Sequence, residues 1–190
     1  MLIAGIDYSL CGPSICMYNG DSKNFKYENC TFYFLTNTKK FATYFGTNII
    51  GENFDEFNHE VERYQTIADW AMDCLMGCDQ VALEGYAYAA TSNRVFQIAE
   101  NTGLLKYKLF QNSIPVTIVP PTEVKKFATG KGNSDKNSVY AFFEVETHAG
   151  LVSLFYPAMK APKEIKSPIS DIADSYFICK YLFNQLKQSD

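Results

Sequence analysis

The sequence predicts an α/β protein built on one mixed sheet of five strands, with helices on both faces. Two features of the chain predict this architecture. Three short β-prone runs follow one another at the start of the chain, and consecutive strands form an antiparallel meander. Two later β-prone runs are separated by helical segments, and such crossover connections favour parallel pairing.

Each predicted strand is a short apolar or aromatic run that ends at a turn. The five runs are residues 2–8, 14–18, 26–35, 80–84 and 115–119. The first contains Asp7 near its end, and the fourth ends in Glu84. Residues 36–56 carry two glycines and no regular period, so we expect irregular structure there. The length favours a single domain over residues 1–190, with a candidate insertion at 36–60.

Helices are predicted where apolar residues recur three to four positions apart. The expected helices span residues 57–77, 91–111, 121–128, 135–146 and 168–187. In the first helix, the apolar period begins at Phe57 and includes Val61. The last helix opens at Ser167 and Pro168, because proline is favoured at the first helical position. Residues 147–167 are expected to be irregular.

Charge is distributed unevenly along the chain. The net charge is -4. Residues 51–80 hold eight acidic residues against Arg63, whereas residues 94–140 hold seven bases against three acids. A polyanion could contact the second region while the first faces solvent. The overall acidity is therefore only weak evidence against a nucleic-acid partner.

Cysteine usage and the N-terminus predict a cytoplasmic protein. The six cysteines show neither paired C-x-x-C spacing nor the density of a disulfide scaffold, so we expect reduced, buried thiols. The first residues lack the basic region and small-residue cleavage site of a signal peptide. The apolar runs are shorter than a membrane span. His59 and His148 stand alone, and we assign them no role.

Four acidic residues are the candidate catalytic residues. Asp7 and Glu84 end two strands that, as parallel neighbours, would bring both carboxylates to one edge of the sheet. Asp171 and Asp174 are three residues apart on a helix, so they share one face. Mg²⁺ and Mn²⁺ prefer such oxygen ligands. Two ions roughly 4 Å apart can activate water on one side of a phosphate and stabilise the leaving oxygen on the other.

Each acid taken singly has a more ordinary explanation. An Asp that ends a strand is usually a turn residue, and Glu84 before Gly85 could be a solvated loop acid. Asp171 and Asp174, near the start of a helix, could simply complement its dipole. Only the combination of these acids with their flanking sequences indicates a metal site.

Four segments of the chain together form a recognisable pattern. They are GIDYSLCGPSI at 5–15, VALEGYAY at 81–88, PPTEVKKFATGKGNSDKNSV at 120–139 and SDIADSYFICKYL at 170–182. In this order they resemble the RuvC family of Holliday-junction resolvases, which have an RNase H-like fold. The lysine loop followed by the D-x-A-D helix is the most specific part. A compact, divergent sequence of this kind would suit a phage or viral member.

The resemblance implies an activity and a site. It assigns Asp7, Glu84, Asp171 and Asp174 as the ligands of two Mg²⁺ ions in an endodeoxyribonuclease, with Mn²⁺ able to substitute. Asp7 would bridge both ions, with Glu84 and Asp171 on one side and Asp174 on the other. Hydrolysis would leave 5′-phosphate and 3′-hydroxyl ends. Family members act as homodimers, in which each subunit nicks one of two like-polarity strands of a four-way junction.

Lysines and tyrosines are the expected DNA contacts. By resemblance, Lys125 and Lys136 support catalysis or contact phosphate; we add Lys131 because lysines bind the phosphate backbone as mobile charges. The ordinary alternative is a solvated loop. The family's stacking aromatic falls between Tyr86 and Tyr88, and stacking contributes about 1–3 kcal/mol per base. Core packing or a subunit contact is the alternative for either tyrosine.

Three other functions compete with junction resolution. A related RNase H-like nuclease could use the same acids on flaps, branches or RNA–DNA hybrids. An ATPase of the actin-like superfamily begins with a similar strand, but it needs two such lobes and a Gly-rich adenosine motif, which we do not find in the sequence. A non-catalytic junction-binding module would not need all four acids. The expected location is the cytoplasm, or the host cytoplasm for a viral member.

Overall fold

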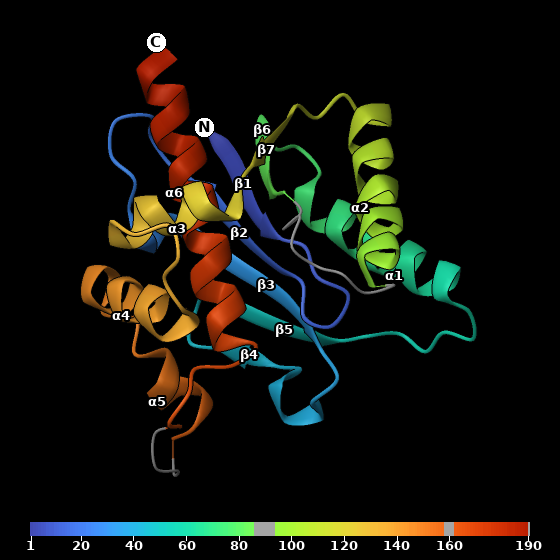
Figure 1. The fold of residues 1–190 in the computed structure, drawn as a ribbon, viewed down its shortest axis with the longest axis horizontal. Helices are drawn as coiled ribbons and strands as arrows, with labels where there is room; N and C mark the ends of the chain where they lie inside the picture. The colour runs from blue at the N-terminus through green and yellow to red at the C-terminus, as the bar shows by residue number, and fades with distance from the viewer. Residues whose placement is uncertain (86–93, 158–161, 190) are drawn as a thin grey trace.

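The protein is described by a computed structural model that covers residues 1–85, 94–157 and 162–189 (Figure 1). Among these residues, one mixed sheet of seven strands forms the centre of the molecule. The strands are β1 (Leu2–Asp7), β2 (Ser14–Asn19), β3 (Cys30–Thr36), β4 (Tyr44–Phe45), β5 (Ile49–Asn53), β6 (Gln80–Glu84) and β7 (Val116–Val119). Helices cover both faces, so the predicted α/β architecture is confirmed.

The helices largely follow the predicted segments. They are α1 (Glu60–Leu75), α2 (Arg94–Gln111), α3 (Pro121–Thr129), α4 (Lys136–Thr147), α5 (Leu151–Phe155) and α6 (Ile169–Ser189), with 3-10 turns η1 (Tyr27–Asn29) and η2 (Lys39–Phe41). The short helix α5 lies in a segment that we predicted to be irregular. In the described part of the chain, no helix has the length and apolar character needed to cross a membrane.

The start of α1 differs from the prediction. The Glu62 carboxylate accepts hydrogen bonds from the backbone N–H groups of Asn58 at 2.7 Å and His59 at 3.3 Å, which places the first helical turn after His59. Phe57 therefore precedes the helix and is 39% exposed, and Val61 is 70% exposed. Neither residue belongs to the inner face that the apolar period suggested.

The sheet topology brings the two strand-borne acids together. The strand order is β4-β5-β3-β2-β1-β6-β7. As predicted, β1, β2 and β3 form an antiparallel meander, and β6 and β7 continue the sheet in parallel beside β1. Ile6 pairs with Leu83 across β1 and β6, so Asp7 and Glu84 come next on neighbouring strands. Both acids reach the same edge of the sheet.

The segment predicted to be an irregular insertion extends the sheet instead. β5 pairs in parallel with β3, and β4 pairs antiparallel with β5, which raises the number of strands from the expected five to seven. Gly51, one of the two glycines that suggested a loop, lies inside β5. A Cβ at Gly51 would lie 2.0 Å from the carbonyl oxygen of Phe41, so this glycine permits a close backbone contact.

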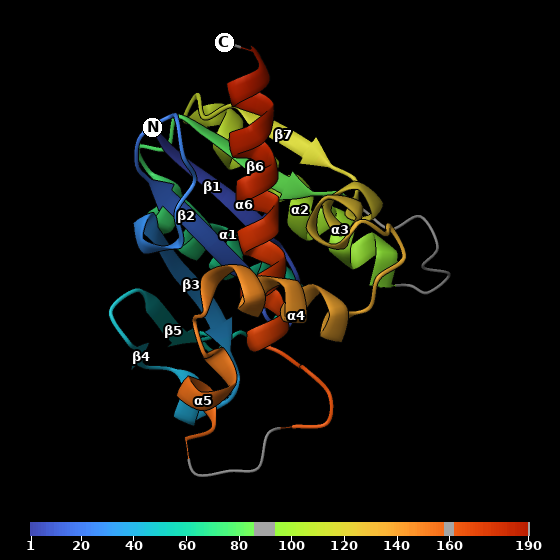
Figure 2. The ribbon, with the colours of Figure 1, turned by 90° about the vertical axis from the view of Figure 1, so that its left-hand side faces the viewer.

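Side chains of β1 and β6 alternate between two cores. Ile3 and Ala82 belong to the core that contains α6, whereas Ile6 belongs to the core that contains α1 and α2. Successive side chains of a strand point to opposite faces, so Asp7 and Glu84 face α6. Figure 2 shows α6 lying across this face of the sheet, with α3 and α4 on the same side.

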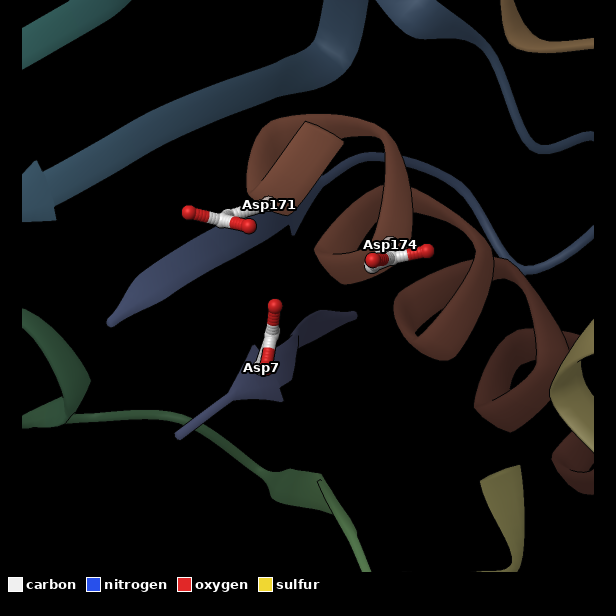
Figure 3. A group of neighbouring side chains, drawn as sticks. All are labelled: Asp7, Asp171 and Asp174. Carbon is white, nitrogen blue, oxygen red and sulfur yellow. The ribbon is translucent and has the colours of Figure 1, made fainter. Parts of the chain in front are cut away.

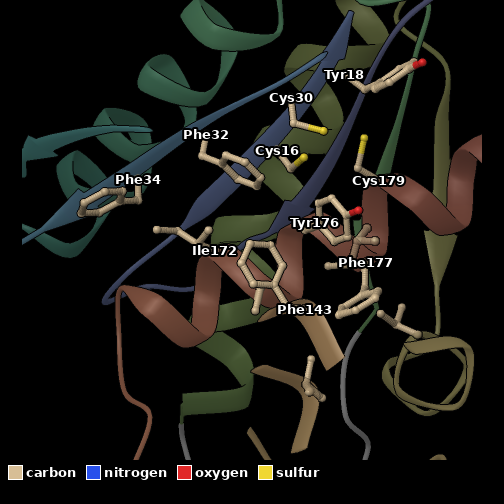
Figure 4. Close-up of a cluster of buried hydrophobic side chains, with 14 of the residues drawn as sticks. Cys16, Tyr18, Cys30, Phe32, Phe34, Phe143, Ile172, Tyr176, Phe177 and Cys179 are labelled. Atoms are coloured by element: carbon tan, nitrogen blue, oxygen red, sulfur yellow. The ribbon is translucent and has the colours of Figure 1, made fainter. Parts of the chain in front are cut away.

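A glycine sets the distance between α6 and β1. A Cβ at Gly5 would lie 2.1 Å from the backbone nitrogen of Cys179 and 2.6 Å from the carbonyl oxygen of Ser175, so the helix and strand backbones nearly touch. Aromatic side chains from β3, α4 and α6 fill the adjoining core (Figure 4): Phe32, Phe34, Phe143, Tyr176 and Phe177. The close contact carries the first turns of α6 over the end of β1.

The cysteines are free thiols, as expected. Cys16, Cys30 and Cys179 lie together in the α6 core, where Figure 4 shows them. Cys11 departs from the prediction because it is exposed.

Candidate metal centre

Three carboxylates meet at the end of β1. Asp7, Asp171 and Asp174 each offer one oxygen atom, and these oxygens lie within 4.8 Å of one another. Figure 3 shows the three side chains around a common space, Asp7 from β1 and the other two from α6. The three-residue spacing puts Asp171 and Asp174 on one helical face. The expected convergence is present for these three acids, and their role as metal ligands stays a prediction.

Glu84 approaches the cluster from β6, although it does not belong to that group of three. It is partly buried and stands beside Asp7 on the neighbouring strand. Burial, followed by repulsion from Asp174, raises the pKa of Glu84 from 4.5 to about 7. The charge on Glu84 in turn contributes to a raised pKa at Asp7. The fourth acid therefore shares the electrostatic environment of the other three.

Crowding of negative charge is the dominant feature of this site. Burial raises the pKa of Asp7 well above its ordinary value, and repulsion from Asp171, Asp174 and Glu84 raises it further. Burial also raises the pKa of Asp174 from 3.8 to about 6. Ionised carboxylates held this close oppose folding until a proton or a cation neutralises them. Because all the donors are carboxylate oxygens, the group suits a hard divalent cation.

Asp171 is the most buried of the four acids, at 5% exposed, and its orientation is fixed by neighbours. Lys136 Nζ donates to Asp171 Oδ1 at 3.0 Å, and Ser170 Oγ donates to the same oxygen at 2.8 Å. Lys136 Nζ also donates to Ser170 Oγ at 3.2 Å. On the other side, a Cβ at Gly12 would lie 3.0 Å from Asp171 Oδ2 and 2.7 Å from Ser167 Oγ. The turn between β1 and β2 thus packs directly against Asp171.

Two of the three predicted lysines interact electrostatically with the acids. Burial lowers the pKa of Lys136, but attraction from Asp171 and the other acids outweighs it, so this pKa is raised. The charge of Lys125, on α3, lowers the pKa of Glu84. Lys131 is exposed in the loop after α3 and is not among the charges that act on Asp7, Glu84 or Asp174.

Comparison with known proteins relates this fold to solved structures. No family model and no curated protein matches the sequence. Thermus thermophilus RuvC matches with a TM-score of 0.62 and 17% identity over 99% of this chain and 97% of that one. The T. thermophilus RuvC complex with a Holliday junction substrate matches with a TM-score of 0.61 and 17% identity, over 100% and 96%. The yeast mitochondrial Holliday junction resolvase Ydc2 matches with a TM-score of 0.51 and 13% identity, over 99% and 84%.

The chain has the fold of RuvC. The likeness extends over nearly the whole length of both chains, and it confirms the RNase H-like fold that the sequence segments predicted. The sheet and α6 supply the frame in which the acids converge. Tyr86 and Tyr88, the predicted stacking residues, lie outside the described residues, so their contact with DNA stays a prediction.

The RuvC-like frame also positions residues that the sequence did not single out. Neither Ser170 nor Gly12 was predicted as a site residue, yet both lie against Asp171. Arg63, the single base in an acidic segment, donates to the Leu10 carbonyl at 2.6 Å and so anchors the turn after β1. Gly12 and Arg63 contact residues that are distant in the sequence, and no local pattern marks such contacts. Ser170 directly precedes Asp171 on α6, but its contact with Lys136 comes from α4.

A cavity of about 540 Å³ opens beside the acids. Asp7 and Glu84 lie at its wall, together with polar and apolar side chains from the turn after β1, from α1 and from α2: Tyr8, Leu10, Arg63, Gln97 and Ile98. The strand-borne acids are therefore accessible to a ligand and are not sealed in the core.

Proposed function

We propose that the chain is a divalent-metal-dependent endonuclease that resolves four-way DNA junctions, with residues 1–190 forming a single nuclease domain. The convergence of Asp7, Asp171 and Asp174, with Glu84 beside them, carries the proposal. Support comes from the fold, because solved structures that share it include RuvC in complex with a Holliday junction substrate and a yeast mitochondrial Holliday junction resolvase.

The donor set fits Mg²⁺, and we expect Mn²⁺ to substitute. Asp7, Glu84, Asp171 and Asp174 would be the ligands of the bound ions. When bound, such cations supply Lewis-acid stabilisation of the scissile phosphate and of the attacking and leaving oxygens. The four acids act as ligands and not as proton-transfer groups.

The cationic side chains of the chain hold the phosphate. Lys136 lies 3.0 Å from an oxygen of Asp171, and Lys125 is close enough to lower the pKa of Glu84. Both ammonium groups therefore offset the charge of the acids and contact the phosphate there. Lys131 contacts the DNA backbone further from the cleaved bond. Water attacks phosphorus in line, the bond from phosphorus to O3′ breaks, and the products are a 5′-phosphate and a 3′-hydroxyl.

Two copies of the chain act on one junction. A four-way junction has two like-polarity strands related by a two-fold axis, and a homodimer presents two acid clusters in the same symmetry. One nick from each copy resolves the junction. Tyr86 or Tyr88 stacks on a base exposed at the branch point.

A cleavage assay on defined substrates tests the proposal. The wild-type chain is incubated with a four-way junction, a flap, an RNA–DNA hybrid and a linear duplex, in Mg²⁺, Mn²⁺ or EDTA. We expect paired, symmetric nicks in the junction, with 5′-phosphate ends, only when metal is present. If flaps or hybrids are cleaved at the same rate as the junction, the chain is a nuclease with a broader range of substrates and not a junction resolvase. If the chain binds the junction but cleaves none of the substrates, the proposed nuclease activity is refuted and a non-catalytic junction-binding module is favoured.

A further inference from the structure

The cavity beside the acids has the lining of a site for a flat organic group. Its volume, about 540 Å³, is typical of pockets that hold small ligands. Leu10, which is buried, and Ile98, which packs against the α1 and α2 core, form apolar parts of its wall. Gln97 and Arg63 add polar groups to the same space. Such a lining suits a planar ring that is covered on its faces and recognised at its edge.

Two polar atoms in this lining have no hydrogen-bond partner within the described residues. One is the hydroxyl oxygen of Tyr8, a residue that is only 7% exposed. The other is Nε of Arg63, which is buried as well. A buried polar group without a partner carries an unpaid desolvation cost, which a ligand can remove by bonding to it. Both atoms are therefore available to the polar edge of a ligand.

The guanidinium of Arg63 is held in place by its own chain. Arg63 Nη2 donates to the Leu10 carbonyl at 2.6 Å, and Nη1 lies 3.8 Å from a carboxylate oxygen of Glu60. The guanidinium also stands over the ring of Phe57, 5.2 Å from its centre. These contacts fix the group before a ligand arrives, so little side-chain freedom is lost when the ligand binds.

The cavity and the acid cluster share a wall. Asp7 and Glu84 line the cavity, and Asp7 also belongs to the cluster with Asp171 and Asp174. A phosphate bound at these acids through cations therefore has the cavity directly beside it. The group next to a phosphate along a DNA strand is a nucleoside, and every nucleobase has a flat π-face and a polar edge.

We infer that the cavity holds the unpaired base of the nucleotide next to the scissile phosphate, with Gln97 and Arg63 in contact with its edge. The base site rests on the proposed function, which places that phosphate at the acids. Leu10 and Ile98 cover the ring, and the Tyr8 hydroxyl gains a partner. Amide and guanidinium groups are common partners of base edges. A base that is mispaired or already unpaired leaves its stack at least cost, which favours entry near a branch point.

Cross-linking tests whether the base enters the cavity. Cys11 is exposed and lines the cavity, so its thiol can trap a base there. Four-way junctions carry one base with an alkyl tether that ends in an activated disulfide, placed in turn at each position around the cut. The wild-type chain in EDTA should form a mixed disulfide with the base next to the scissile phosphate, and Cys11→Ser should form none. Equal linking at all positions, or no linking, overturns the inference.

Two altered junctions provide an independent test by cleavage rate. A mismatch opposite the chosen nucleotide removes the cost of unpairing and should speed cleavage by at least about threefold. An abasic sugar at the same nucleotide removes the base that the cavity would hold and should slow cleavage by about tenfold. Both changes loosen the branch point. If both change the rate in the same direction, looseness alone explains the result and the inference is overturned.

Gln97→Ala tests the contact at the base edge. In the wild type, the normal junction should be cleaved about ten times faster than the abasic one, and in this variant the ratio should fall below about three. A general loss of folded chain slows both substrates equally and leaves the ratio unchanged. Gln65→Ala, at an exposed position on α1, is the matched control and should keep the wild-type ratio. An unchanged ratio in Gln97→Ala overturns the role of Gln97.

The outcomes separate the base site from the nuclease activity. Paired nicks in the junction, without a cross-link at Cys11 and without slower cleavage of the abasic junction, uphold the nuclease and overturn the base site. A cross-link at one base of the branch point in a chain that never cleaves refutes the nuclease and upholds binding of a base in the cavity.

Discussion

Replacing Asp7 by Asn should stabilise the metal-free protein while abolishing cleavage. Burial and mutual repulsion raise the pKa values of Asp7, Glu84 and Asp174. Each of these acids, when ionised at pH 7, therefore opposes folding in the absence of a cation. Asn keeps the size and shape of Asp7 and removes its charge from the cluster.

The magnitude follows from a neighbouring acid. The pKa of Asp174 rises from 3.8 to about 6, and one pKa unit corresponds to about 1.4 kcal/mol, so its ionisation in the folded chain costs on the order of 3 kcal/mol. The relief at Asp7 should be smaller, on the order of 2 kcal/mol, because Asn is still a polar group in a partly buried position. For a domain of this length, that raises Tm by about 4–8 °C.

Thermal unfolding and junction cleavage are measured together. In EDTA at pH 7, Asp7→Asn should melt above the wild type; on addition of Mg²⁺ the wild type should gain stability and the variant much less. The rate of cleavage by the variant should fall by at least about a hundredfold, because replacing even a residue that only hydrogen-bonds to a metal ligand can lower activity by that factor. Asp73→Asn, at an exposed position on α1, is the matched control and should change neither property.

Two results would refute this reasoning. If Asp7→Asn is no more stable than the wild type in EDTA, the acids do not repel one another as their positions require. If Mg²⁺ stabilises the variant as strongly as the wild type, the cation binds elsewhere.

Three further predictions concern the surroundings of the site. The metal-free wild type should lose stability as the pH rises from about 4 to about 7. The pKa of Glu84 is about 7 in the folded chain and 4.5 ordinarily, so the protonated form that the fold favours is lost over that interval. Unfolding in EDTA at several pH values checks this, and Mg²⁺ should make stability less dependent on pH. Gly5→Ala should cost about 3 kcal/mol, because its Cβ would lie 2.1 Å from a backbone nitrogen of α6; an unchanged urea midpoint would mean that α6 can move away freely. Lys136→Ala should slow cleavage and destabilise the fold by only about 1 kcal/mol, because the ion pair that is lost is half exposed. Lys126→Ala on α3 is the control. If the two substitutions have equal effects, Lys136 has no role in the site.

The sequence by itself determined the elements that carry the acids. The runs that end at Asp7 and Glu84 are short and continuously apolar, as in buried parallel strands. The three-residue spacing of Asp171 and Asp174 implies one helical face in any helix. The order of a meander followed by crossovers implied parallel pairing beside β1, which the structure has. These inferences succeed because period, spacing and connection length are local properties of a chain.

Only the tertiary structure decided which distant groups meet. Gly51 has the local signature of a loop, yet it pairs with Phe34 in β5, where the Phe41 carbonyl leaves no room for a side chain. Lys136 reaches Asp171 through the packing of α4 beside α6, which no sequence spacing encodes. The four acids could be chosen from the sequence, but the distances among them depend on how closely α6 packs on β1. Burial and contact depend on what the rest of the chain brings against each face, and a local pattern does not contain that information.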